Sequence, residues 1–409
     1  MRIGIVDADL IGRKKHRFPN LACEKISGYY KGLGNDVSLV LSYEDFSQYD
    51  QVFVSKVFTD TAIPNWLLEY VDGDYPGEYY TEIPPKYGRS WPTIRVGGTG
   101  FYFDKAPNLP DEIEHHFPDY HLYDEWIFSD IAQAKQIALN KGKKFNESVY
   151  KSQYKEYLDY SIGFVTRGCF RKCGFCVNQK YDCAFIASPL DEFFDSGRKK
   201  ICLLDDNFLS YPEWKRIIQE IQAKGQPFKF KQGLDERLLT KEKCELFFNS
   251  KYDGDLTFAF DNVSDYELIH EKLKMIERYN RNKGVMFYVL VGFESTDAKD
   301  IENAFKRIEL LLHYKCLPYI MRYMSEDSAP WKESRYRTFY VTLARWCNQP
   351  SILKKMTFRE FCIANEKLRK VKAGHCSAYQ AMLDFERENP ELAKEYFDIR
   401  FGEPNPKFL

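Results

Sequence analysis

The chain has 409 residues, more than one compact domain usually holds, so two or three structural units are expected. Its formal net charge of −1 excludes a general electrostatic attraction to nucleic acid or anionic lipid and leaves only local basic patches for such partners. No apolar run approaches a membrane span, and the 11 cysteines fit a reducing compartment with one metal site better than a disulfide framework, so a cytoplasmic protein without membrane contact is expected.

Residues 1–126 alternate strand and helix signals. Strands are predicted over residues 3–6, 37–41, 52–57 and 93–96, and a helix over 20–33 ends at Gly34. This spacing predicts a parallel, doubly wound, Rossmann-like N-terminal domain. The run Gly97-Gly98-Thr99-Gly100 is either a turn that a ligand approaches closely or a plain strand-to-helix turn.

Residues 127–157 are predicted to be a helix followed by a linker. The pattern over 127–139 is helical, whereas 140–159 is polar and rich in Lys and Tyr, which favours a solvated linker. His115, His116 and His121 lack the regular spacing of metal ligands, so surface positions are expected for them.

A cysteine cluster follows a strand predicted over residues 160–165. Cys169, Cys173 and Cys176 are separated by three and then two residues, and a helix-length segment is expected after them. Thiolates are the ligands that iron–sulfur clusters select, and three of them leave one iron of a four-iron cluster open. A closed zinc site is the alternative, but it would need a fourth ligand, for which Cys183 is the near candidate.

This C-x3-C-x2-C spacing, with Phe175 before the third cysteine, resembles the signature of radical S-adenosylmethionine (SAM) enzymes. The resemblance implies that Cys169, Cys173 and Cys176 hold a [4Fe-4S] cluster whose open iron is chelated by SAM. It also implies reductive cleavage of SAM to a 5′-deoxyadenosyl radical and an external electron donor such as flavodoxin or ferredoxin.

Five further strands are predicted over 200–204, 228–231, 256–260, 285–291 and 316–321, with helices between them. Together with 160–165 they predict a partial (β/α)6 barrel, a partial TIM barrel, over residues 158–325. Polar residues recur where the strands stop, and parallel α/β barrels hold their chemistry there.

The same resemblance, closest to the cobalamin-binding-domain and methylthiotransferase-like class, assigns SAM contacts to these strand ends. Asp206 and its neighbours are expected to meet the SAM amino group, and the guanidinium of Arg237 suits the SAM carboxylate. The cofactor-binding residues so implied are Phe175, Asp205, Asp206, Asn207, Arg237, Asp261, Gly292 and Glu294. In the alternative, the acids cap helices and Arg237 forms a surface ion pair.

The N-terminal unit resembles, in layout, the cobalamin-binding-type domain of many family members. The D-x-H-x-x-G motif is missing, since Asp7, Asp9 and His16 have another spacing, so cobalamin is an alternative that the sequence does not favour. A methylthiotransferase would need a second cluster in this unit, where Cys23 is the only cysteine.

Residues 326–409 are predicted to be a mostly helical extension. Residues 331–372 contain eleven Lys and Arg against three Asp and Glu, interleaved with Tyr336, Phe339, Tyr340, Trp346 and Phe358. Such a segment binds phosphates and stacks bases, or instead covers the open side of the barrel. Three cysteines are expected to lie in the core, namely Cys202, Cys244 and Cys316. An auxiliary cluster on Cys347, Cys362 and Cys376 is an alternative that their wide spacing does not favour.

The sequence therefore predicts a radical SAM enzyme that acts on an unidentified substrate, with a nucleobase in nucleic acid as the leading hypothesis. Alternatives are a cobalamin-dependent methyltransferase and a modification of a peptide or small metabolite. A noncatalytic iron–sulfur or zinc module is the alternative from another class.

Overall fold

The computed structural model describes the whole chain except residues 14–17, 69–91, 281, 326–327, 369–376 and 409. It is a mixed α/β protein with two compact units. The first contains Met1–Lys172, Cys176–Leu204 and Gly225–Pro227, and the second contains Cys173–Phe175, Asp205–Lys224 and Phe228–Leu409. Among the helices of the described residues, none is both long and apolar enough to cross a membrane.

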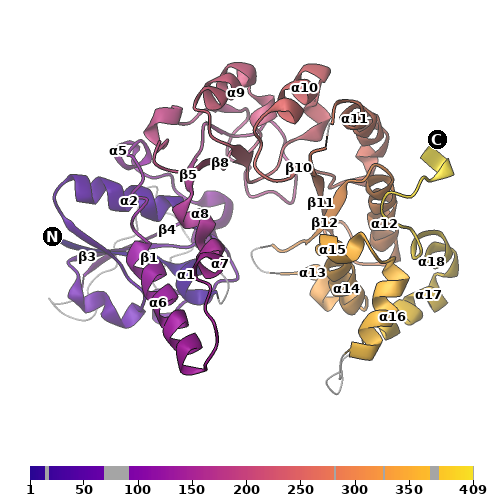
Figure 1. Cartoon of the computed structure of the whole chain (residues 1–409), viewed down its shortest axis with the longest axis horizontal. Coiled ribbons are helices and arrows are strands. Elements are labelled where there is room, and N and C mark those ends of the chain that lie inside the picture. The colour runs from indigo at the N-terminus through magenta and orange to yellow at the C-terminus, as the bar shows by residue number, and fades with distance from the viewer. Residues whose placement is uncertain (14–17, 69–91, 281, 326–327, 369–376, 409) are drawn as a thin grey trace. The chain divides into compact units, whose positions relative to one another are not determined.

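A four-stranded parallel sheet forms the centre of the first unit (Figure 1). Its strands lie in the order β2-β1-β3-β4, with bounds Asp36–Leu39, Arg2–Asp7, Gln51–Ser55 and Thr93–Gly97. The register pairs Asp7 with Ser55 and Ser55 with Gly97, so the carboxyl ends of three strands meet at one edge. All four strands were predicted from the sequence.

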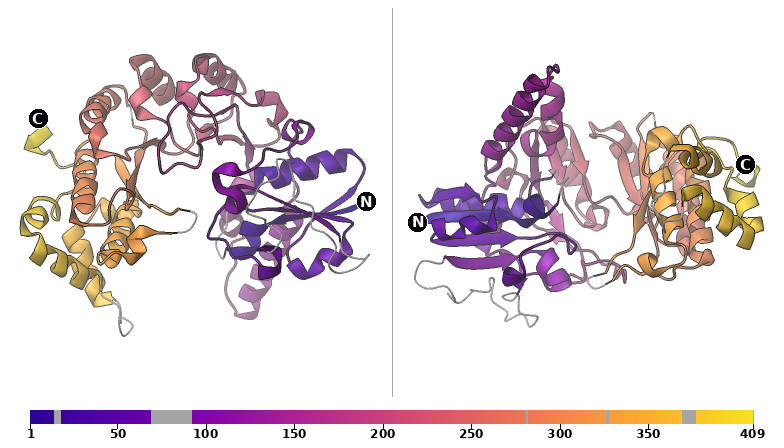
Figure 2. Two further views of the ribbon diagram at one scale, coloured as in Figure 1. Left: turned by 180° about the vertical axis from the view of Figure 1, so that it is seen from behind. Right: turned by 90° about the horizontal axis from the view of Figure 1, so that it is seen from below.

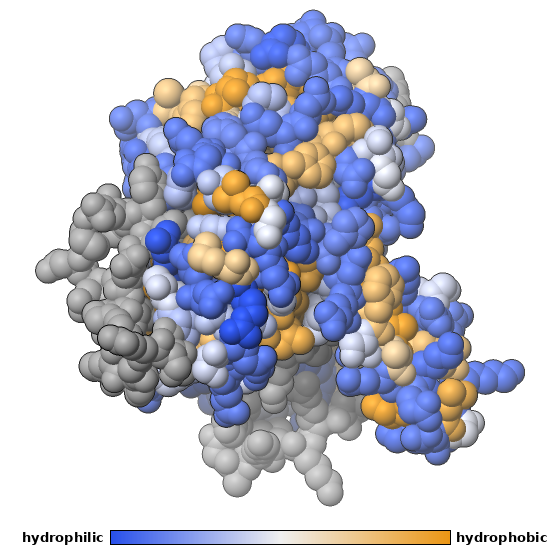
Figure 3. All heavy atoms as spheres, turned by 90° about the vertical axis from the view of Figure 1, so that its left-hand side faces the viewer, coloured by the Kyte–Doolittle hydropathy of each residue, from blue (hydrophilic) through white to orange (hydrophobic). Residues whose placement is uncertain are grey.

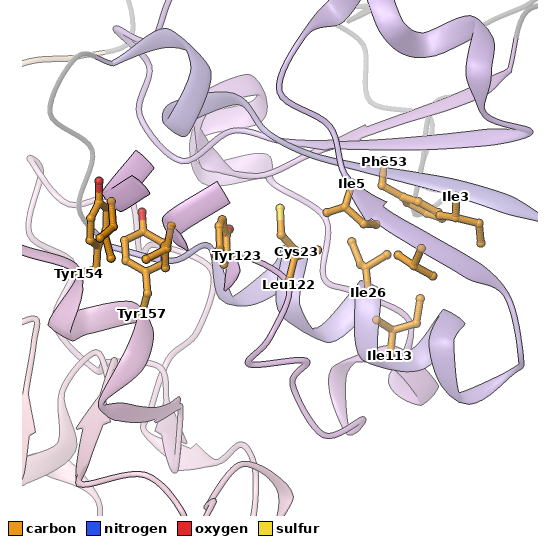
Figure 4. Close-up of a cluster of buried hydrophobic side chains, with 13 residues drawn as sticks. Ile3, Ile5, Cys23, Ile26, Phe53, Ile113, Leu122, Tyr123, Tyr154 and Tyr157 are labelled. Carbon is orange, nitrogen blue, oxygen red and sulfur yellow. The ribbon is translucent and has the colours of Figure 1, made fainter. Parts of the chain in front are cut away.

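Both faces of this sheet are covered because apolar residues alternate along the strands. On one face Ile5 and Phe53 pack with Ile26 of α2 (Leu21–Gly32) and with Ile127 of α6 (Asp124–Asn140), as Figure 4 shows in part. Asn20 caps α2 by accepting the N–H groups of residues 22 and 23. The other face buries a separate cluster that includes Val6, Val52 and Ile94.

Part of the stretch 140–159, where a linker is expected, packs onto the first unit. Helices α7 (Glu147–Lys151) and α8 (Lys155–Leu158) follow α6, and Tyr154 and Tyr157 are only 1% and 2% exposed. Their rings join Tyr123 in the core (Figure 4). The lysines that made the segment look solvated lie on its exposed side, while the tyrosines anchor it.

Shorter helices complete this part of the chain. They are α1 (Ala8–Gly12), α3 (Asn65–Leu68), α4 (Thr99–Tyr102) and α5 (Asp111–Glu114).

The view in Figure 3 shows a mostly hydrophilic face whose apolar residues form small, separate groups.

Two strand pairs follow in the same unit. Strand β5 (Tyr160–Gly163) pairs in parallel with β8 (Lys200–Leu203), and β6 (Thr166–Arg167) pairs antiparallel with β7 (Phe185–Ile186). The helix expected after the cysteines is wrong: between Cys176 and β8 the chain forms turns, β7 and one short 3-10 turn at Leu190–Glu192. Polar side chains hold this segment as a loop, as described below.

The second unit continues the strand and helix alternation at the predicted places (Figure 1). Strands β10 (Leu256–Ala259), β11 (Val285–Val291) and β12 (Leu317–Arg322) form a parallel sheet. Parallel bridges join Phe228 to Tyr252 and Leu234 to Phe258, beside β9 (Phe228–Phe230). The helices between these strands are α9 (Trp214–Ala223), α10 (Lys241–Asn249), α11 (Tyr266–Tyr279) and α12 (Ala298–His313). Closure of the six strands into a partial barrel stays a prediction.

The C-terminal extension is helical, as predicted, and shares a core with α12 (Figure 2). Phe305 of α12 packs against Phe339, Phe358 and Phe397, with ring centroids 5.5–6.3 Å apart. The helices are α13 (Pro330–Glu333), α14 (Arg337–Cys347), α15 (Pro350–Leu353), α16 (Phe358–Leu368), α17 (Ala378–Glu388) and α18 (Pro390–Tyr396).

Candidate functional site

The three clustered cysteines lie in one loop, residues 168–184, whose two ends are tied by β6 and β7. Gly168 has φ +87°, and a Cβ there would collide with the carbonyl oxygen of Cys183. Glycine is required at this position for both reasons. The loop therefore begins and ends at a fixed point of the fold.

Lys172 closes this loop from within. Its Nζ donates hydrogen bonds of 2.8 Å to the carbonyls of Gln179 and Tyr181 and pairs with Asp182 at 2.8 Å. Gln179 in turn donates to the carbonyl of Cys176 at 3.0 Å. These contacts explain why the segment is a loop and not a helix.

The thiols of the loop receive backbone N–H groups. Cys169 Sγ accepts from the amide of Arg171 at 3.3 Å, and Cys176 Sγ accepts from the amide of Asn178 at 3.4 Å. Thiolate is the form of cysteine that binds metals. In the described residues no three His, Cys, Asp or Glu side chains are gathered as a metal-binding group. The ligand set of Cys169, Cys173 and Cys176 therefore stays a prediction that the chemistry of the loop fits.

Phe175 lies in the second unit, near Phe293, which follows β11 by two residues. Its ring centroid is 5.5 Å from that of Phe293, which in turn lies 4.8 Å from the ring of Tyr323. Gly174 faces the same ring, since a Cβ there would be 3.2 Å from Phe293. The aromatic residue of the motif is thus packed at the carboxyl ends of β11 and β12.

The acids predicted after residue 204 lie partly or fully buried. Asp205 and Asn207 are buried and Asp206 is half-buried. Asn207 donates through Nδ2 to Asp235 at 3.3 Å, which links this turn to the loop after β9.

Arg237 is held by two carboxylates. Its Nε donates to Asp235 at 2.7 Å, and Nη1 donates to Asp265 at 3.0 Å. Within the described residues its other terminal nitrogen makes no such contact, and the side chain is 23% exposed. The ion pairs of the alternative are thus observed, and the SAM contact of Arg237 stays a prediction.

Glu236 is a buried acid that the sequence did not single out. It is 1% exposed, and its Oε2 accepts the amide N–H of Ala259 at 3.1 Å. Burial raises the pKa of the Glu236 carboxyl to about 8, and the charge of Asp235 adds to the rise. The run Asp235-Glu236-Arg237 signalled charge, but not which of its acids points inward.

Asp261 is positioned by an arginine that the sequence also missed. Arg307 of α12 is 2% exposed and donates to the carbonyls of Phe260, Asp261 and Leu290 at 2.8, 2.8 and 2.9 Å. Burial raises the pKa of the Asp261 carboxyl to about 6, against the opposing charge of Arg307. A basic residue within the apolar face of a helix was the signal in the sequence.

Gly292 and Glu294 have contacts within the protein. The amide of Gly292 donates to Asp300 at 2.8 Å, and the Tyr340 hydroxyl donates to the same oxygen at 2.8 Å. Glu294 is exposed and accepts from Nδ2 of Asn262 at 3.0 Å. Packing accounts for the glycine, so its expected SAM contact stays a prediction.

Asp7 and Asp9, at and just after the end of β1, accept hydrogen bonds from other residues of the first unit. Asp7 accepts from the Tyr123 hydroxyl at 2.9 Å and from the amide of Leu10 at 3.2 Å, and burial raises its pKa to about 7. Asp9 accepts from the amide of Val57 at 2.7 Å and from the hydroxyl of Thr61. His16 lies outside the described residues.

The glycine run after β4 also has an internal reason. A Cβ at Gly98, which has φ +105°, or at Gly100 would collide with the backbone of Lys56. The strand-to-helix turn, not the ligand turn, is the alternative that these contacts favour. Neither this loop nor the acids support cobalamin.

The remaining histidines and cysteines have ordinary environments. His115 pairs with Glu192 and His121 with Asp124, each at 2.8 Å, and both histidines are exposed. The cysteines expected in the core are buried, namely Cys202, Cys244 and Cys316. Cys347 and Cys362 are buried too, and Cys376 lies outside the described residues.

The basic tail does not present its aromatic residues for base stacking. Tyr336, Phe339, Tyr340, Trp346 and Phe358 are all buried, at 0–7% exposure. The stacking expectation is therefore wrong for these five residues, because they form the core of the helical extension.

Two of the tail's arginines have acidic partners. Arg335 pairs with Glu388 at 2.8 Å, and Arg359 pairs with Glu386 and Asp398, each at 2.9 Å. An open groove of about 900 Å³ next to Arg335 and Glu388 contains none of the predicted SAM-binding residues.

No protein-family model matches this chain, and no curated protein matches it. Two solved structures are similar at low level. One is Streptococcus suis SuiB bound to S-adenosylmethionine, with a TM-score of 0.33, 13% identity and coverage of 58% of this chain and 64% of that one. The other is Streptococcus suis SuiB, with a TM-score of 0.33, 12% identity and coverage of 73% and 84%. The chain thus spans less than two thirds of the first structure, and similarity of this size says nothing about activity.

Proposed function

We propose that this protein is a radical SAM enzyme that cleaves SAM reductively at a [4Fe-4S] cluster. The observation that carries the proposal is the loop 168–184, in which Cys169, Cys173 and Cys176 stand at C-x3-C-x2-C spacing. Two of these thiols accept backbone N–H groups, and Lys172 ties the loop together.

In this proposal the three cysteines each hold one iron, and the fourth iron is open to SAM. When bound, the cluster would supply one electron to the SAM sulfonium, giving methionine and a 5′-deoxyadenosyl radical. The amides of Arg171 and Asn178 donate to the sulfur atoms of two of these ligands, Cys169 and Cys176.

The strand-end residues of the second unit offer both charges that the amino acid end of SAM needs. The ammonium group of SAM requires acceptors, for which Asp206 is the candidate. Its carboxylate requires donors, for which the guanidinium of Arg237 is the candidate. Asp235 and Asp265 hold the guanidinium in place at 2.7 and 3.0 Å. Phe175 would contribute an apolar face next to Phe293.

A reduced flavodoxin or ferredoxin is the electron donor that this chemistry requires. A nucleobase in nucleic acid remains the leading hypothesis for the substrate, and a peptide or small metabolite remains the alternative. Cobalamin-dependent methyl transfer would require a cobalamin site, for which neither Asp7 nor Asp9 is available without losing its present partners.

The proposal is tested by anaerobic reconstitution with iron and sulfide. Wild type is expected to bind about four irons and to release 5′-deoxyadenosine from SAM after reduction, as measured by iron analysis and mass spectrometry. The variant Cys169→Ala/Cys173→Ala/Cys176→Ala is expected to be colourless and inactive. Cys183→Ala is the matched control, because Cys183 is exposed in the same loop.

Two results would contradict the proposal. Four irons in the triple variant would place the cluster on other cysteines. Binding of one zinc ion, with no cleavage of SAM by the reduced wild type, would leave a noncatalytic metal module.

A further inference from the structure

Two cations and an indole lie together at the carboxyl ends of β11 and β12. Arg322 is the last residue of β12 and pairs in register with Val291, the last residue of β11. Trp331 is only 6% exposed and packs on Gly292, where a Cβ would lie 3.1 Å from Trp331 Cβ and 3.7 Å from its Cδ1. The pyrrole side of the indole therefore lies against the end of β11.

The cations flank this indole. The guanidinium carbon of Arg322 lies 4.2 Å from the ring centroid, and Nζ of Lys332 lies 5.8 Å from it. A guanidinium that stacks on a ring keeps the N–H groups along its edge available, so the stacking holds Arg322 without using its donors.

No acid neutralises this pair within the part of the chain that the structure describes. Neither Arg322 nor Lys332 makes a side-chain hydrogen bond or an ion pair there, although Arg237, Arg335 and Arg359 each have carboxylate partners. The acid that follows β11, Glu294, accepts from Asn262. Burial lowers the pKa of the half-buried Arg322, which has no acidic partner among the described residues; Glu326 and Asp327 lie outside them.

A third donor at this place also lacks an acceptor. Nε1 of Trp331 is buried and makes no hydrogen bond among the described residues. Buried indole N–H groups usually have a partner. Among the described residues, the N–H without an acceptor and the two cations without an acid are independent observations, and an oxyanion would satisfy both.

We propose that Arg322, Lys332 and Trp331 Nε1 form a binding site for a phosphate group of the substrate. The proposal deepens the radical SAM assignment, on which its link to a substrate rests, by naming a phosphate-bearing compound as the substrate class. Two positive charges and a bidentate guanidinium edge suit phosphate better than the single charge of a carboxylate. The carboxyl ends of parallel strands are where such folds hold their ligands.

The test is a titration of the full-length protein with inorganic phosphate at constant ionic strength, followed by calorimetry. Wild type is expected to show saturable binding. Arg322→Gln should weaken the binding about tenfold or more, since charge-assisted hydrogen bonds are lost. Lys332→Gln, at an exposed position, and Trp331→Phe should each weaken it several-fold.

Arg278→Gln is the matched control, because Arg278 is an exposed arginine on α11 of the same unit, and its affinity should equal that of wild type. The proposal is overturned if wild type shows no saturable binding or if Arg322→Gln and Lys332→Gln both bind as wild type does. An equal loss in Arg278→Gln would also overturn it, since only overall charge would then matter. Acetate that binds as tightly as phosphate would refute the phosphate assignment.

The titration needs neither cluster nor SAM, so it separates this site from the proposed reaction. Wild type that binds phosphate but does not cleave SAM would contradict the radical SAM function alone. Wild type that cleaves SAM but does not bind phosphate would contradict the phosphate site alone.

Discussion

At the scale of single residues, the charges around Arg237 define the second unit's candidate site. Three acids surround this guanidinium, with Asp235 and Asp265 in hydrogen-bond contact and Glu236 3.8 Å away. Burial raises the pKa of Glu236 to about 8, so near neutral pH this acid is mostly protonated. The arginine is thus balanced by two carboxylates, and its position is fixed before any ligand binds.

Arg237→Ala is expected to weaken SAM binding roughly tenfold or more, because one charge-assisted contact contributes on the order of 1.5–3 kcal/mol. The dissociation constant of SAM for the reconstituted protein measures this. Arg216→Ala is the control, since Arg216 forms exposed ion pairs on α9. Unchanged affinity in Arg237→Ala would reduce Arg237 to an ion pair with no role in binding.

The raised pKa of Glu236 predicts that the stability of the protein depends on pH. Between pH 4.5 and about 8 the folded protein retains a proton that the unfolded chain releases, so the free energy of unfolding should fall as pH rises through this window. Glu236→Gln stays neutral and should lose the part of this dependence that Glu236 contributes, at most on the order of 4 kcal/mol, while Asp7 and Asp261, whose pKa values burial also raises, keep their parts. Urea unfolding at pH 5 and pH 9 measures the effect.

The control for that measurement is Glu277→Gln, at an exposed position of α11, which should follow wild type. A Glu236→Gln variant whose stability falls between pH 5 and 9 as steeply as that of wild type would show that other groups cause the fall.

At the scale of elements, the cysteine loop depends on how its ends are joined. Strands β6 and β7 have only two residues each, so the closure relies on the positive φ and the missing side chain at Gly168. Helix α12 is also fixed by a few side-chain contacts. Arg307 donates hydrogen bonds at the ends of β10 and β11, and Asp300 accepts one from Gly292. The position of each of these elements therefore depends on one or two residues.

Gly168→Ala is expected to reduce the iron bound after reconstitution by at least half while leaving the far-ultraviolet circular dichroism unchanged. The added Cβ meets the carbonyl of Cys183 and opens the loop. Gly225→Ala is the matched control: its φ of +77° is similar, but a Cβ there has nothing within 4 Å. If both variants lose iron equally, backbone strain and not loop closure is responsible.

At the scale of the whole molecule, aromatic clusters join two segments to the compact units. The C-terminal extension belongs to the second compact unit, because Phe305, Phe358 and Phe397 share one aromatic cluster. Residues 127–157 belong to the first unit through Tyr154 and Tyr157.

Phe397→Ala should therefore lower the free energy of unfolding of the second unit by about 3–5 kcal/mol, the usual cost of deleting a buried phenyl ring. Phe397 is 0% exposed, whereas Leu268 on α11 is 44% exposed and Leu268→Ala should have little effect. Denaturant unfolding monitored by tryptophan fluorescence measures both variants. An equally small loss for Phe397→Ala would mean that the extension is not part of that unit's stable core.

The sequence by itself determined where the elements lie and which loop carries the cysteines. Strand β11 has the predicted bounds, and the other predicted strands differ by a few residues at most. Such agreement is expected because strand and helix signals arise from residues that are neighbours in the chain. The C-x3-C-x2-C spacing is likewise a local property.

Only the tertiary structure decided which of these residues meet. Composition made Lys-rich and Tyr-rich segments look like a linker and a stacking surface, but Tyr157 and Tyr340 are buried. The partners of Arg237 and the buried position of Glu236 depend on separate segments brought together by folding. Charge and burial are properties of three-dimensional neighbours, so a pattern read along the chain identifies ionisable residues but not their pairs or their pKa values.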